Sequence, residues 1–169
     1  MGFPGGTVVR VTPTLLTAAY ADNEVGVNSV EIPNAVSNRG GTSVLRGVSI
    51  VCTDAGLNPL GEILFHESEQ SFGTAGAQVS LTDAQSKSMG FLGWVNIQAT
   101  DNYNIGSSAD SSMIFYTLGA KADDPPFNNI MLKAAGGSTS CYFTVIPNVA
   151  WDFEDTTEMQ FIFSIEYLD

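Results

Sequence analysis

Charged side chains are scarce in this sequence, and positive charge is the scarcest. Asp, Glu, Lys and Arg make up 14% of the 169 residues, against about 25% in an ordinary globular domain. Six basic residues stand against eighteen acidic ones, so the formal net charge is −12. Such a chain repels phosphate backbones and anionic lipid. We therefore expect no nucleic acid and no membrane among its partners, and a surface built from Ser, Thr, Asn, Gln and Gly.

Long apolar runs and secretory signals are also lacking. The sequence contains no stretch of about 18 apolar residues, the length that a membrane span requires. It also contains no Asn-x-Ser/Thr sequon, which would mark a secreted surface. Glycines and a proline interrupt the residues after Met1, where a signal peptide would be apolar. These absences predict synthesis in a cytoplasm.

Cysteine is limited to two positions. Cys52 continues an alternating row with Val48 and Ile50, and Cys141 begins a row with Phe143. Both thiols are therefore predicted to point inward as small hydrophobes. A disulfide between them is the alternative, disfavoured in a chain without a secretory signal.

Catalytic chemistry has few residues to use. His66 is the single histidine, and we expect it at a surface or sheet edge, because the sequence supplies no evident partners for a triad or a metal site. The acidic residues Asp152, Glu154, Asp155 and Glu158 are interpreted as solvated surface rather than as a glycosidase pair or a calcium site, although Asp152 and Glu154 would share a strand face. Residues 101–106 hint at a calcium loop but fail its alternating ligand rule, and predict a polar turn. We expect no catalytic residue, cofactor or metal.

The glycine pairs do not build a phosphate site. Gly40-Gly41 and Gly136-Gly137 lack the lysine and the following helix that a phosphate cradle requires. They are predicted to be loop tips.

Alternation of apolar and polar residues is what the sequence has in abundance. Met159, Phe161, Phe163, Ile165 and Tyr167 occupy every second position near the end of the chain, as in a strand with one buried face. The same pattern, bounded by Gly, Pro, Asn or Asp, predicts nine strands: Thr7–Thr12, Gly26–Ile32, Thr42–Thr53, Gly61–Glu67, Phe91–Ala99, Met113–Leu118, Asn129–Lys133, Ser140–Ile146 and Glu158–Leu168.

Nine strands joined by turns predict an all-β fold, a two-sheet antiparallel β-sandwich. A jelly roll fits better than an immunoglobulin-like domain, because the order Cys52, Trp94, Cys141 spans too many residues for the latter. One short helix is expected within Ser80–Met89, where Thr82 and Gln85 form a capping-box pattern. The strands 42–53 and 61–67 are predicted to form a hairpin.

Nothing in the sequence divides the chain into two domains. We expect residues 7–169 to form a single domain, whose size allows a core without staples, and residues 1–6 to form a flexible arm. Trp94 and Trp151 could stack on a sugar, although aromatic residues on strands are more often core or interface.

Short segments spread along the chain resemble a group of small virion proteins of tailed phages. They are Val11-Thr12-Pro13-Thr14-Leu15, Ala18, Ala19-Tyr20-Ala21, Val25-Gly26, Asn34-Ala35, Gly40-Gly41, the strand through Val48, Leu64-Phe65, Leu81-Thr82-Asp83, Gly90 before the Trp94 strand, and Tyr167-Leu168. The resemblance implies a component of the phage particle, of the head decoration or cement type, and it implies no catalytic residues.

Three functions are therefore open to this chain. The first is a decoration protein that binds the major capsid protein on the outside of the head as a homotrimer, with Gly2, Phe3, Pro4, Val8 and Arg10 as candidate contacts. The second is a tail or fibre module that binds glycans through Trp94 or Trp151. The third is a glycan-acting enzyme, which would need two carboxylates converging in a cleft. The first is favoured, because an acidic protein is poorly placed against packaged DNA.

Overall fold

The computed structural model describes residues 5–54, 57, 59–98, 102–104, 114–117 and 129–168. Nine of the strands found there lie within one or two residues of their predicted ends. The elements are β1 (Gly6–Val11), β2 (Val27–Ile32), β3 (Thr42–Cys52), β4 (Gly61–His66), α1 (Asp83–Ser88), β5 (Phe91–Ile97), β6 (Asn102–Asn104), β7 (Ile114–Thr117), β8 (Ile130–Lys133), β9 (Cys141–Pro147) and β10 (Met159–Tyr167).

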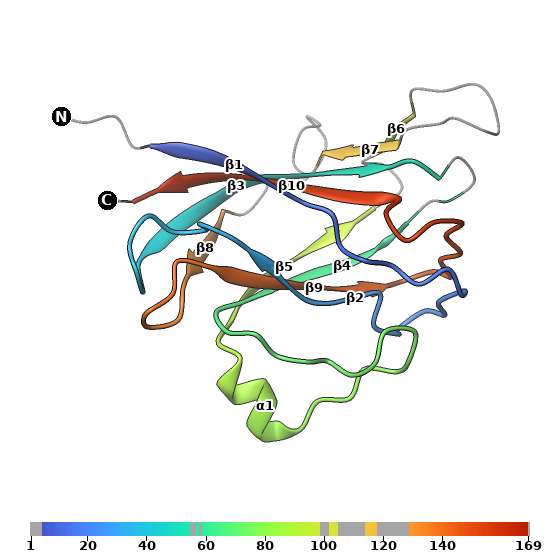
Figure 1. The fold of residues 1–169 in the computed structure, drawn as a ribbon, viewed down its shortest axis with the longest axis horizontal. Coiled ribbons are helices and arrows are strands. Elements are labelled where there is room, and N and C mark those ends of the chain that lie inside the picture. Colours follow the sequence, from blue (N-terminus) through green and yellow to red (C-terminus); the bar gives the residue numbers. More distant parts are fainter. Residues whose placement is uncertain are drawn as a thin grey trace.

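The strands form two antiparallel sheets packed face to face (Figure 1). One is six-stranded, in the order β1-β10-β3-β7-β6, and the other is four-stranded, in the order β2-β9-β4-β5. β8 also pairs with β3, along Thr42–Leu45, while β7 pairs with Ser49–Cys52 of the same strand. With β6, β7 and β8 counted as one position, successive strands change sheet everywhere except between β4 and β5, as in a jelly roll. The predicted fold class is confirmed.

The predicted hairpin between residues 42–53 and 61–67 is wrong. β3 belongs to the six-stranded sheet and pairs with β10, β7 and β8, whereas β4 belongs to the other sheet and pairs with β5 and β9. The connection after Cys52 therefore crosses from one sheet to the other. Turn residues mark where a strand ends, but they do not specify which strand pairs with it.

β6 is the strand that the sequence did not predict. Its three residues lie in the segment interpreted as a polar turn, and Tyr103 pairs with Phe115 of β7. A strand this short shows no alternation to detect, and it is recognised by its pairing. The rest of the hinted calcium loop, residues 101, 105 and 106, lies outside the described residues.

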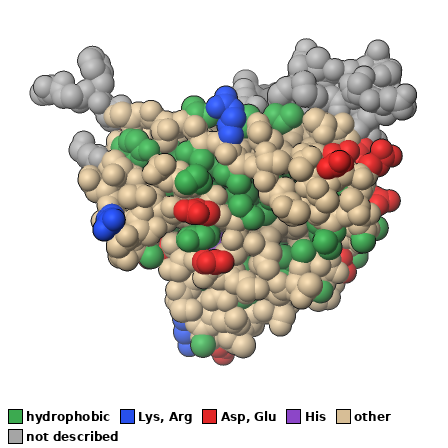
Figure 2. All heavy atoms as spheres, viewed as in Figure 1, with side chains coloured by type: hydrophobic (Ala, Val, Ile, Leu, Met, Phe, Trp, Pro, Cys, Tyr) green, Lys and Arg blue, Asp and Glu red, His purple; other side chains and the backbone are tan. Residues whose placement is uncertain are grey.

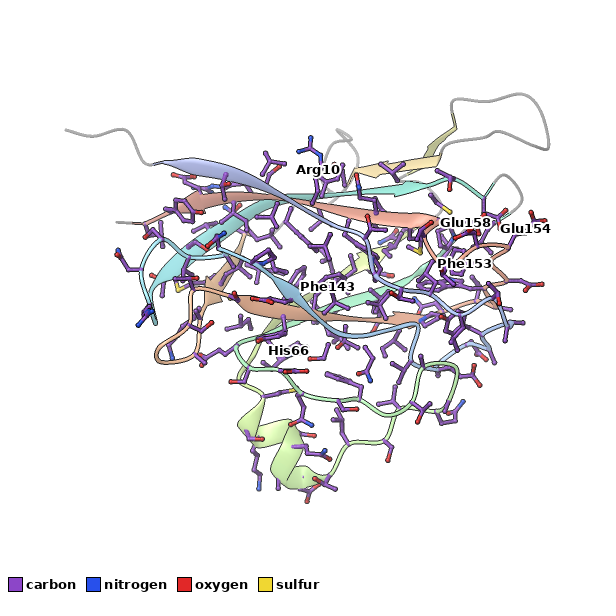
Figure 3. All side chains as sticks on the ribbon, in the orientation of Figure 1. Arg10, His66, Phe143, Phe153, Glu154 and Glu158 are labelled. Carbon is purple, nitrogen blue, oxygen red and sulfur yellow. The ribbon has the colours of Figure 1, made fainter. Side chains whose placement is uncertain are left out.

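The core fills the space between the sheets with the inward rows of both. Phe161 and Phe163 of β10 are buried and contact Phe143 of β9, with ring centroids 4.9 and 5.1 Å apart, and Phe163 also contacts Phe65 of β4 at 5.9 Å. Figure 3 shows Phe143 lying between the two layers.

The two cysteines are buried in this core as free thiols, as the alternation predicted. Cys52 lies on the six-stranded sheet and Cys141 on the four-stranded one. The disulfide is not formed. Burial raises the pKa of both thiols to about 12, which makes them poor nucleophiles at neutral pH.

Helix α1 lies outside the sandwich, beyond the four-stranded sheet (Figure 1). It begins as predicted, because the Thr82 hydroxyl accepts from the Gln85 N–H and the Gln85 side chain accepts from the Thr82 N–H. The glycine pairs are loop tips, also as predicted. Gly40 and Gly137 adopt φ of 69° and 89° there, a region that side chains with a Cβ disfavour.

Candidate functional site

His66 is buried, with 0% of its surface exposed, so the prediction of a surface or edge histidine is wrong. β4 is an inner strand between β9 and β5, and the side chain of His66 lies on the outer face of that sheet, opposite Tyr142. A long segment then folds back over this face and buries the imidazole. We call residues 67–82 the strap. Figure 3 shows His66 between the sheet and the strap.

The strap is held to the sheet by polar side chains of β2. The Asn28 amide donates to the Gly73 carbonyl at 2.7 Å, and its oxygen accepts from the Phe72 N–H at 2.9 Å. The Ser29 hydroxyl accepts from the Gln70 N–H at 2.9 Å. These bonds satisfy backbone groups that would otherwise be left without partners beneath the loop.

His66 itself completes the contact between strap and sheet. Its Nδ1 is 2.7 Å from the Ser68 carbonyl oxygen, and its Nε2 is 3.2 Å from the Thr144 hydroxyl. The ring stacks on Tyr142, and it packs at 5.5 Å from the ring of Phe72. A carbonyl acceptor at Nδ1 requires a proton there, which leaves Nε2 to accept from Thr144.

The surroundings of His66 favour the neutral imidazole. Burial lowers its pKa below 6.5, and the hydrogen bond to the Ser68 carbonyl opposes this in part. Glu67 beside it in the chain pairs instead with Lys133 at 2.9 Å. Burial, and then Glu31 and Glu69, raise the pKa of the stacked Tyr142. His66 has no hydrogen-bonded carboxylate among the described residues to orient it as a catalytic base, and its contacts are those of a residue that holds the strap.

Stability should therefore depend on pH through this one side chain. Between pH 6.5 and the lower pKa in the folded state, the unfolded chain binds a proton that the folded chain does not, so the free energy of unfolding falls as the pH falls. The slope can reach about 1.4 kcal/mol per pH unit for one proton. Urea unfolding at several pH values between about 7.5 and 5 should show this loss of stability. Carboxylates titrate at lower pH, near about pH 4, so they contribute little in this window.

The matched variant is His66→Gln, which removes the titrating group. It should be less stable than the parent at pH 7, because it loses the ring contacts, but its stability should change little between pH 6.5 and 5. Equal slopes in the two proteins would contradict a neutral buried His66.

The acidic residues near β10 cap a turn instead of converging on a site. Asp152 and Glu154 do not share a strand face as expected, because residues 152–158 form no strand. Glu158 Oε2 accepts from the N–H groups of Glu154 and Asp155, at 2.9 and 3.1 Å. The hydroxyl and N–H of Thr157 lower the pKa of Asp155. Figure 2 shows acidic side chains gathered at the end of the sandwich where Figure 3 labels Glu154 and Glu158.

Among the described residues, no three His, Cys, Asp or Glu side chains lie close enough together to hold a metal ion. No helix among the same residues has the length and the apolar character to cross a bilayer.

The two tryptophans differ completely in exposure. Trp151 is 0% exposed, and its Nε1 donates to the Leu60 carbonyl at 3.1 Å. It packs against Tyr20 and Phe153, so it cannot stack on a sugar. The prediction of Trp151 as a candidate glycan contact is wrong. Trp94, in contrast, is 54% exposed on the outer face of β5. The sequence could not separate them, because each lies among apolar residues in a segment that could be buried.

The outward side chains of β1 and β10 form the second candidate surface. We call Val8, Arg10, Ile162 and Ser164 the β1 face. Val8 pairs with Ser164, and Arg10 pairs with Ile162, while Val9 between them points into the core. Val8 is 52% exposed. Figure 3 shows Arg10 at the outer surface of the six-stranded sheet.

A shallow hollow adjoins the β1 face. It has a volume of about 380 Å³ and is lined by Gly6, Thr7, Val8, Arg46, Ser164, Ile165 and Glu166. The register of β10 on β3 shifts between Ser164 and Ile165, and this irregularity lies in the wall of the hollow. Two of the lining residues, Arg46 and Glu166, form an ion pair. The hollow combines apolar surface from Val8 and Ile165 with one ion pair.

The first described residues of the chain are hydrogen-bonded to β10. β1 begins at Gly6, and the Gly5 carbonyl accepts from the Tyr167 N–H at 2.9 Å. Gly5 and Gly6 of the expected arm thus lie along β10. Three of the candidate capsid contacts, Gly2, Phe3 and Pro4, lie outside the described residues.

Comparison with protein-family models, with curated proteins and with solved structures found no match to this chain. The strand order of the two sheets makes this chain a jelly-roll β-sandwich. Its two candidate surfaces are the β1 face and the outer face of β5.

Proposed function

We propose that this chain is a non-enzymatic structural protein of a tailed-phage virion. In this role it is a decoration or cement protein that docks on the outside of the head, where it contacts the major capsid protein and stabilises the shell. Jelly rolls occur in viral capsid proteins, and also in lectins and cupins. The fold is compatible with the role, and the choice among these classes rests on the surface.

The observation that carries the proposal is the position of β1 at the edge of the six-stranded sheet. One of its edges pairs with β10, and no other described strand pairs with its second edge. An edge strand can extend a neighbour's sheet through main-chain hydrogen bonds, without needing a pocket. The half-exposed Val8 and the hollow beside it add apolar surface at the same place.

Charge supports an outer position on the shell. The net charge of −12 opposes contact with packaged DNA. Arg10 places a positive charge on the β1 face, away from the acidic turn at residues 152–158 (Figure 3). A capsid partner that docks on the β1 face would therefore avoid the acidic end of the sandwich.

We propose a homotrimer as the docking unit. Closed symmetric oligomers leave no binding face open to further growth, and a surface of low charge is compatible with subunit contact. Light scattering on the free protein, and on protein released from particles, measures this state. Monomer in both samples would count against the trimer.

Binding to undecorated heads tests the proposal. Val8→Asp should weaken binding by about tenfold or more, because it places a carboxylate in an apolar contact, a change of at least about 1.4 kcal/mol. Val79→Asp is the matched control, because Val79 is an exposed valine on the strap, against the opposite sheet. Cosedimentation gives the affinity, and the rupture temperature of the heads should rise with bound protein.

The arm requires a separate deletion. Removing Met1–Pro4 spares the Gly5 bond to Tyr167, so the β1 pairing remains intact while Gly2, Phe3 and Pro4 are lost. Unchanged affinity would exclude the arm from the contact but leave the β1 face. If the full-length protein neither binds heads nor raises their rupture temperature, the decoration function is lost.

A further inference from the structure

We propose that the outer face of β5 is a binding site for a neutral sugar ring, which stacks on Trp94. The site would be a second activity of the chain, on the sheet opposite the β1 face. It consists of Trp94 and Asn96 of β5 with Glu62 and Leu64 of β4, and we call these four residues the Trp94 platform.

The register of β5 forces Trp94 outward. Gly93 and Val95 on either side face the core, and the position of a Cβ on Gly93 would lie 3.2 Å from Ile130. Trp94 lies between these two inward positions and pairs with Leu64, so its indole points to the outer face of the sheet. Single small apolar residues are common on protein surfaces, whereas a large exposed aromatic side chain indicates a binding surface.

A second aromatic lies on the same face of the same strand. Phe91 pairs with His66, whose side chain is also on the outer face, and it is 49% exposed. The backbone there is fixed, because the Glu67 N–H bonds to the Met89 and Gly90 carbonyls at 3.1 and 3.0 Å. This end of β5 is thus held against the end of β4, which keeps the surface preorganised.

Polar groups flank the indole on the neighbouring positions of the sheet. Leu64 pairs directly with Trp94 across the two strands, and the next outward pair is Glu62 with Asn96. The Asn148 amide, 3.4 Å from the Asn96 oxygen, extends this polar row. A pyranose ring has an apolar face of C–H groups and a rim of hydroxyls. The indole matches the ring face, while carboxylate and amide groups beside it match the hydroxyls.

Charge selects a neutral sugar. Glu62 belongs to the platform itself, and the chain carries a net charge of −12. A sialylated or uronic sugar would meet like charge at this site, which disfavours its binding. Lys133, which lies on β8, is already paired with Glu67.

The two tryptophans provide a direct readout. Trp94 is accessible to an aqueous quencher, whereas the buried Trp151 is not. We would titrate the intact protein with methyl glycosides of galactose, glucose and mannose, and then with an array of neutral oligosaccharides. At least one neutral probe should protect Trp94 from acrylamide and shift its emission to shorter wavelength. A sialylated version of the bound glycan should bind more weakly.

Substitutions at Trp94 and at an exposed apolar residue outside the Trp94 platform test whether the indole carries the sugar affinity. Trp94→Ala should lower the affinity by about tenfold or more, and Trp94→Phe by less, because a smaller ring still stacks. Met131→Ala, which removes an exposed apolar side chain from β8, should leave the affinity unchanged. Circular dichroism of Trp94→Ala should match the parent.

Two results would overturn the inference. One is that no neutral glycan protects Trp94. The other is protection that rises with protein concentration in the absence of sugar, which would make the platform an interface between copies of this chain. Either result would leave the head-binding test unaffected, since that test reads the β1 face.

Discussion

Replacing Phe163 by alanine should lower the free energy of unfolding by about 3 to 5 kcal/mol. The side chain is fully buried and touches three aromatic rings: Phe65 on β4, Phe143 on β9 and Phe161 two positions away on β10. It thus joins the central strands of both sheets. Removing it leaves a cavity between layers whose strands are paired on both sides and cannot move together to fill it.

Urea unfolding at pH 7.5 measures this loss, with two comparisons on the same strand. Phe161→Ala should cost a similar amount, because Phe161 lies in the same inward row against Phe143. Gln160→Ala should change stability by no more than about 0.5 kcal/mol, because its side chain points outward. Similar losses at Gln160 and Phe163 would contradict the register of β10.

The period-two pattern explains why β10 was predictable. Apolar side chains fill every second position from Met159 to Tyr167. The structure buries the first four of them, and Tyr167 at the end of the row is half-buried. The start of the helix at Thr82 was predictable for the same reason, because its capping box involves residues only three positions apart. Features of this kind depend on near neighbours in sequence, so the sequence displays them.

Contacts between segments far apart in the sequence were harder to predict. The segment after Cys52 reads as a hairpin turn, yet β3 already has partners on both edges and the chain must cross to the other sheet. His66 looked like a surface residue because its cover, the strap, binds through Asn28 and Ser29 from a distant strand. Trp94 and Trp151 differ for the same reason, since burial depends on which segment packs over each ring.

Replacing Trp151 by alanine should be as costly as the change at Phe163, about 3 to 5 kcal/mol. Its ring packs edge-on against Tyr20 and Phe153, at 6.0 and 5.7 Å, and its backbone bonds with Tyr20 in both directions. The residue ties the connection between β1 and β2 to the segment before β10. Its loss also leaves the Leu60 carbonyl without its indole donor.

Trp94→Ala is the matched control for this prediction, and the pair tests the assignment of the two rings. Because Trp94 is mostly exposed, its loss should change the free energy of unfolding by no more than about 0.5 kcal/mol. Trp151→Phe should recover part of the stability lost in Trp151→Ala, since it restores a ring but not the N–H donor. Equal costs for Trp94→Ala and Trp151→Ala would mean that Trp94 is buried in solution. The sugar platform would then be lost together with the exposed face of β5 on which it depends.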